Sequence, residues 1–199
     1  MSTSSSDLEL VQDGGSQTVG LRFAGVPLAR GTEIESAYLQ FTCDESSDGA
    51  TDLLIQGELS PNAKQFSPSS HDISSRPRTL TEVPWSPPAW TKVDRAGQAE
   101  RSADIRALVE EIVNQPEWES GNAMTFVVTG QGRRVAVAAR GKSSNATKLV
   151  VNTGSGKASE EIAEDTTPYT VKLLFAAPRE EREPRIFDVY LQGSLIAEN

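Results

Sequence analysis

The chain has little of the chemistry that most catalytic and metal sites need. Its 199 residues include one cysteine, Cys43, and one histidine, His71. Cys43 has no partner for an internal disulfide, and a thiol on an apolar strand is expected to pack as a small core side chain. His71 lies in a loop rich in serine and proline, without a second histidine or a nearby cysteine, so zinc has no ligand set. Because a general base without an activated nucleophile has no role, the sequence argues against an enzyme.

Long apolar runs are absent as well, and acidic residues outnumber basic ones. No run is long enough to span a bilayer. Residues 1–6 have neither the charged nor the apolar region of a signal peptide, so we expect an intracellular chain or one whose leader is absent from this sequence. The net charge is −9 and the isoelectric point is about 4.7. Such a surface repels phosphate backbones and anionic lipids, which argues against nucleic acid partners and membrane insertion.

The chain does contain apolar residues that alternate with polar ones, the pattern of half-buried strands. Val19, Leu21 and Phe23 show it first, and it recurs along the chain. The predicted strands lie at residues 19–23, 37–43, 53–55, 124–129, 135–139 and 149–151. Turn-forming residues separate the first three, which predicts an antiparallel protein with one main domain.

One segment has helical periodicity instead. Over residues 103–114 apolar side chains recur every three or four positions, as in a helix that lies on a sheet. Ser102 is a candidate N-cap, and Pro116 follows the predicted end. Trp118, which we place in the core, then leads into an apolar strand. This order is typical of a β-sandwich with one inserted α-helix.

Two further segments interrupt the pattern. Six prolines between residues 60 and 102 predict a long surface excursion with one short strand near residues 80–85. Residues 153–168 are small, polar and acidic, which is typical of a linker. The tail, residues 169–199, contains two predicted strands at 169–175 and 185–191. Since a lone hairpin is marginal in water, we expect the tail to dock on the main module or pair with another chain.

Several separated motifs agree in order with a known family. They are Ser-Asp-Leu-Glu-Leu at 6–10, the strand at 17–23, Ser-Ala-Tyr-Leu-Gln-Phe at 36–41, Ile-Ser-Ser-Arg-Pro at 73–77 and Trp-Ser-Pro-Pro-Ala-Trp at 85–90, followed by the helix and Trp118. Over residues 5–152 the chain resembles β-jelly-roll modules of the disaggregatase-related carbohydrate-binding type, which occur in large secreted or surface proteins of environmental bacteria. The resemblance implies a mostly β jelly-roll sandwich, a glycan ligand and an extracellular or cell-surface location. The tail resembles the last strands of malectin-type domains.

Sugar recognition needs an apolar face for the ring and planar polar groups for the hydroxyls. Trp85 and Trp90 flank a rigid proline-rich loop that could hold such a face, and Arg76 and Arg78 could clamp a uronate carboxylate. The alternative is structural. In that case one or both rings cap the open end of the sandwich, and the two arginines pair with surface acids.

Four acids, Asp44, Glu45, Asp48 and Asp52, follow one another closely in sequence. Loop carboxylates of this kind hold calcium in sandwich modules. Their spacing does not match an EF-hand loop, and a solvated acidic turn needs no ion. Calcium is the one cofactor that the sequence suggests.

These observations predict a non-catalytic, extracellular carbohydrate-binding-like module. The alternative is a structural cell-surface or filament protein that assembles through β-strand addition and forms homo-oligomers through exposed sheet edges. A hydrolase is a third class. Glu58 and Asp188 are its only candidate acids on strands, and the sequence identifies no cleft that would bring them together.

Overall fold

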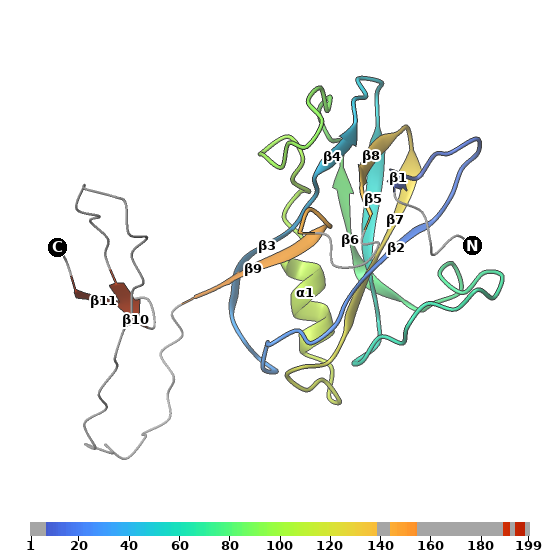
Figure 1. Cartoon of the computed structure of the whole chain (residues 1–199). Coiled ribbons are helices and arrows are strands. Elements are labelled where there is room, and N and C mark those ends of the chain that lie inside the picture. Colours follow the sequence, from blue (N-terminus) through green and yellow to red (C-terminus); the bar gives the residue numbers. More distant parts are fainter. Residues whose placement is uncertain (1–6, 139–143, 155–188, 192–193, 198–199) are drawn as a thin grey trace, which may run out of the picture. The chain divides into compact units, whose positions relative to one another are not determined.

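The computed structural model describes residues 7–138, 144–154, 189–191 and 194–197 (Figure 1). Each segment predicted as a strand between residues 19 and 151 contains one. The elements are β1 (Asp7–Leu10), β2 (Val19–Phe23), β3 (Ile34–Gln40), β4 (Cys43–Glu45), β5 (Asp52–Glu58), β6 (Arg78–Trp85), α1 (Arg106–Val113), β7 (Met124–Gln131), β8 (Arg134–Val137), β9 (Lys148–Thr153), β10 (Val189–Leu191) and β11 (Ser194–Ala197).

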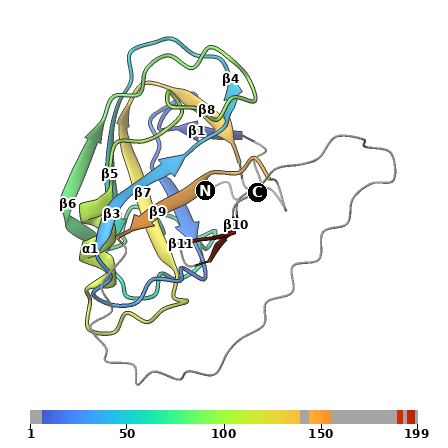
Figure 2. The ribbon, with the colours of Figure 1, turned by 90° about the vertical axis from the view of Figure 1, so that its left-hand side faces the viewer.

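The strands form two layers in the order of a jelly roll. One layer is β2-β7-β5-β6. The other begins as β1-β8-β4 and continues as β3-β9, because only Phe41 and Thr42 separate the end of β3 from the start of β4. The Val137 N–H donates to the Thr42 carbonyl (3.0 Å) and holds β8 against this connection. Figure 2 shows β5, β6 and β7 in one layer and β1, β4 and β8 in the other. The chain crosses repeatedly between the layers, as Greek-key connections require, so the predicted mostly β sandwich with one helix is confirmed.

The helix packs against β3, β5 and β6 through an apolar stripe that includes Leu108 and Ile112, both 0% exposed. It begins at Arg106, so Ser102 is not its N-cap. Ser102 Oγ accepts from the Leu39 N–H (2.9 Å) instead and ties the chain to β3. Trp118 follows the helix in the core at 3% exposure, as predicted.

The last part of the predicted surface excursion belongs to the sandwich. The Phe41 N–H donates to the Glu100 carbonyl and the Cys43 N–H to the Arg95 carbonyl, both at 2.9 Å. Residues 95–102 therefore line the outer edge of β3 and β4 on the surface, without forming a strand of their own.

The tail is a separate unit, residues 159–199, and the boundary after Ala158 falls inside the predicted linker. Within it, β10 pairs antiparallel with β11. The other predicted strand of the tail, residues 169–175, lies outside the described residues. Among the described elements no helix is long and apolar enough to cross a membrane.

Candidate functional site

The two tryptophans predicted to contact a ligand lie in the core. Trp85 is 6% exposed and Trp90 is 0% exposed. The Phe41 ring stacks on Trp85 with centroids 5.4 Å apart and lies 5.9 Å from Trp90. The indole N–H of Trp90 donates to the Ala99 carbonyl (2.9 Å). Neither ring presents a face to solvent, so the structural alternative, rings that plug the sandwich, is the one that this fold adopts.

Arg76, predicted to clamp a uronate, is occupied within the protein. Its guanidinium donates to Glu58 (2.8 Å) and Asp72 (3.0 Å) and to the carbonyls of residues 64 and 65. Burial lowers the pKa of Arg76, but the two carboxylates outweigh burial and the pKa is raised. Arg76 therefore fastens the loop at residues 64–76 and has no donor to spare for a ligand.

Arg78 is also turned inward. Its Nη2 donates to the Ile73 carbonyl (3.2 Å), while Nη1 is shielded from solvent and has no hydrogen-bond partner among the described residues. Burial lowers the pKa of this guanidinium. Together the two arginines stabilise the base of the loop.

The acids of the turn at residues 44–52 do not converge. Glu45 pairs with Arg133 (2.6 Å), and Asp52 accepts from the Ser86 hydroxyl (2.7 Å). No three acidic, histidine or cysteine side chains of the described residues could hold one metal ion. The described residues therefore supply no side-chain ligand set for calcium at Asp44, Glu45, Asp48 and Asp52, and calcium there stays a prediction. Glu58, the hydrolase candidate, pairs with Arg76, and Asp188 lies outside the described residues.

Sequence reasoning did not single out the outward surface of β3 and β9, here called the Tyr38 face. Its side chains are Ser36, Tyr38, Gln40, Arg101, Lys148, Val150 and Asn152. The antiparallel register places Gln40 opposite Lys148 and Tyr38 opposite Val150, and a bridge places Gln40 next to Arg101. Alternation along β3 predicts that Tyr38 and Gln40 face outward, but it does not show which residues of other segments lie beside them.

Arg101 is held in place on this face without using its hydrogen-bond donors. Its guanidinium lies 4.0 Å from the centroid of the Tyr38 ring. No side-chain hydrogen bond or ion pair of Arg101 occurs within the described residues, and its Nε is shielded from solvent without a partner. A cation–π contact of this kind orients a guanidinium but leaves its N–H groups unsatisfied. Lys148 adds a second positive charge on the far side of Gln40, so the face is locally basic in an acidic chain.

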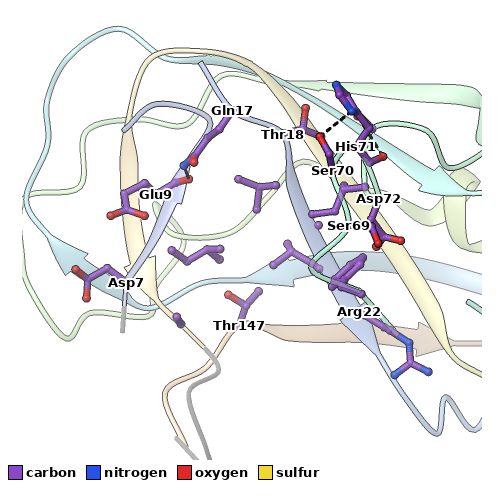
Figure 3. Close-up of a pocket in the computed structure, with 18 of the residues that line it drawn as sticks. Asp7, Glu9, Gln17, Thr18, Arg22, Ser69, Ser70, His71, Asp72 and Thr147 are labelled. Carbon is purple, nitrogen blue, oxygen red and sulfur yellow. Dashed lines mark hydrogen bonds between the residues drawn. The ribbon is translucent and has the colours of Figure 1, made fainter. Parts of the chain in front are cut away.

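A groove of about 820 Å³ lies elsewhere, where edge strands β1 and β2 of the two layers face each other (Figure 3). One wall carries Asp7 and Glu9, and the other is built by β2 and the loop at residues 69–74. Apolar side chains of both layers line the space between the walls, among them Leu8 and Leu21. The Gln17 amide donates to the Glu9 carbonyl (2.8 Å).

Gly20 explains how the loop fits on β2. A Cβ at this position would lie 2.6 Å from Phe66 Cζ and 3.1 Å from Ile73 Cδ1. A larger residue at this position would therefore have to displace the Phe66 and Ile73 side chains from the outward side of β2. His71 lines the same wall, where its Nδ1 is hydrogen-bonded to the Ser70 hydroxyl (2.9 Å).

No family model, curated protein or solved structure matches this chain.

Proposed function

We propose that this chain is a non-catalytic carbohydrate-binding module and that its glycan lies on the Tyr38 face. The observation that carries the proposal is Arg101, a guanidinium fixed against an aromatic ring with its donors unspent. Most other described arginines are already committed, for example Arg76 to Glu58 and Arg133 to Glu45.

The chemistry of the face suits sugar hydroxyls. A guanidinium offers planar pairs of N–H donors, which match vicinal hydroxyls or a carboxylate. The Gln40 amide N–H groups are used by the Phe41 and Gly97 carbonyls, so its oxygen is left as an acceptor. Arg101 covers one face of the Tyr38 ring, so the partly exposed Val150 is the apolar surface beside these groups, the combination that pyranose rings require.

The location outside the cell is part of this proposal. It rests on the resemblance of residues 5–152 to jelly-roll modules of secreted and surface proteins, and the lone buried Cys43 is compatible with any compartment.

The test compares two arginine variants by retention on immobilised polysaccharides, with neutral glucans and polyuronates in parallel. Arg101→Leu should abolish retention. Arg133→Leu is the matched control, since Arg133 is exposed, pairs with Glu45 and lies off the Tyr38 face, and it should be retained like the wild type. Preference for the polyuronate would identify a carboxylate as the partner of Arg101, and preference for the glucan would identify hydroxyls. Equal retention of Arg101→Leu and wild type, or no retention of the wild type on any polysaccharide, would contradict the proposal.

The alternative function, a structural protein that assembles through strand addition, is favoured by one observation. β2 is an edge strand, and no hydrogen bond of its groove-side backbone is present among the described residues. It stays second because β2 has only five residues and lies inside a groove rather than along an open edge. Sedimentation over a range of concentrations tests it, and a monomer throughout would reject it.

A further inference from the structure

The edges of the sandwich are not equally open. At β6, the Glu111 carboxylate accepts from the Leu80 N–H (2.7 Å) and the Thr81 N–H (3.0 Å), and Pro84 has no N–H to offer. Proteins block edge strands in this way against unwanted pairing. At β3 and β4 the outer edge is covered by residues 95–102. The β1 and β2 edges both face the groove, and no such block of β2 occurs in the described part of the chain.

The opposite wall shows a backbone carbonyl that faces the same space. Gln17 Nε2 reaches the Glu9 carbonyl from the groove side, so this carbonyl points away from β8. In an antiparallel ladder the N–H and C=O of one residue point to the same side. The Glu9 N–H is therefore also directed toward the groove. Gln17 already occupies the Glu9 carbonyl, so the main-chain groups left for a ligand are those of the β2 edge and the Glu9 N–H, and another main chain matches them better than a sugar does.

The side chains that line the groove determine which residues a bound strand would need. Val19 and Leu21 of β2 point into the space between the layers and are buried, and Leu8 of β1 packs against the same core. A strand laid beside β2 would therefore place every second side chain on an apolar floor. Figure 3 shows the Asp7 and Glu9 carboxylates on the wall opposite Arg22. The Glu9 carboxylate has no ion pair within the described residues, so a basic side chain of the ligand would find a partner there.

We propose that the groove between β1 and β2 binds an extended peptide segment of a partner protein by strand addition to β2. The segment has about five residues, the length of β2. Its residues alternate between apolar side chains on the groove floor and polar ones, with at least one lysine or arginine next to the β1 wall. This site is separate from the Tyr38 face and does not depend on glycan binding.

The first experiment tests backbone pairing. A fluorescent peptide of alternating valine and lysine or threonine is titrated with the full chain. Two further versions of the peptide carry N-methylated amides, one at the odd-numbered residues and the other at the even-numbered residues. Strand addition to β2 uses the N–H groups of alternate peptide residues, so the peptide methylated at those residues should bind roughly tenfold more weakly. Methylation of the residues that face β1 should weaken binding less, because Gln17 already occupies the Glu9 carbonyl. Equal binding of the two methylated peptides would overturn strand addition.

The second experiment tests the charge. Glu9→Lys should weaken binding of the lysine peptide by about two- to fivefold or more, and the same variant should prefer a glutamate version of the peptide. The control is Glu117→Lys, which makes the same charge change at an exposed residue after α1 and should have no effect. An unchanged preference in Glu9→Lys would overturn the proposed basic partner.

Two further measurements distinguish peptide binding from glycan binding and from self-association. Arg101→Leu should bind the peptide like the wild type, whether or not it binds glycans, so the two proposals can fail independently. If the wild type binds no peptide but self-associates as its concentration rises, a second copy is the occupant, and the partner proposed here is wrong. Absence of both peptide binding and self-association would also overturn it.

Discussion

The packing of α1 on the sheet leads to a prediction that depends on a single methyl group. A Cβ at Gly57 of β5 would lie 2.7 Å from Ile112 Cδ1 and 2.9 Å from Thr79 Cγ2. Gly57→Ala should therefore overpack the core, at a cost of about 1–3 kcal/mol in the free energy of unfolding. Ile112→Val removes the Cδ1 methyl from a fully buried side chain and should cost about 0.5–1.5 kcal/mol.

The double variant should cost less than the sum of the two. The new methyl of Ala at position 57 would occupy the space that Cδ1 of Ile112 leaves, although Thr79 Cγ2 still limits the relief. We expect a coupling energy of about 1 kcal/mol in favour of the double variant. Urea unfolding followed by tryptophan fluorescence measures it, since Trp85, Trp90 and Trp118 are all buried in the sandwich.

The control is Ile105→Val, which removes the same methyl from another fully buried isoleucine that is not among the closest contacts of the Gly57 Cβ position. Its effect should add to that of Gly57→Ala within about 0.5 kcal/mol. Additivity of Ile112→Val with Gly57→Ala to the same margin would refute the reasoning, because the two side chains would then not compete for one space.

Two other variants test interactions at the rim of the sandwich. Arg76→Ala should cost about 3–5 kcal/mol in the free energy of unfolding by urea, because it leaves Glu58, with a side chain 7% exposed, charged and without this partner. The control is Arg133→Ala, which should cost less than about 1 kcal/mol because its partner Glu45 is 48% exposed. Similar costs for the two variants would contradict this. Burial raises the pKa of Glu111, but the N–H groups of Thr81 and Leu80 outweigh burial and lower it in the folded state. Its stabilisation is then complete above the unfolded value of 4.5 and is lost as the pH falls through the lower folded value. Glu111→Gln should accordingly lose less stability than the wild type when urea midpoints at neutral pH and at about pH 3 are compared, and parallel losses would argue against this role.

Much of the fold follows from periods that are local in the sequence. Alternation at Val19, Leu21 and Phe23 identified β2, and the helical stripe through Leu108 and Ile112 identified α1, because each pattern reflects one buried side of one element. The start of the helix was wrong by a few residues. Ser102 has the chemistry of an N-cap, but β3 uses its hydroxyl, and a local pattern cannot reveal a bond to a distant strand.

The candidate site was predicted less well than the fold. Trp90 and Arg76 have the side chains that bind sugars, yet Phe41 and Ala99 enclose the first, and Glu58 and Asp72 occupy the second. Phe41 is 49 residues from Trp90 and Glu58 is 18 residues from Arg76, whereas Asp72 and Ala99 are nearer in the sequence. Whether a polar or aromatic side chain is free to bind a ligand depends on such contacts, which residue type alone does not specify.

By itself, the sequence determined the class of architecture: alternating strands, one inserted helix, a buried Trp118 and a boundary before the tail. The tertiary structure alone decided which groups remain available. It placed Arg101 over Tyr38 with its donors unused, closed the β6 edge with Glu111 and left a groove beside β2. The physical reason is that hydrophobic periodicity is repeated along one element and survives in the sequence, whereas a free guanidinium or an open sheet edge is defined by what the rest of the chain does not cover.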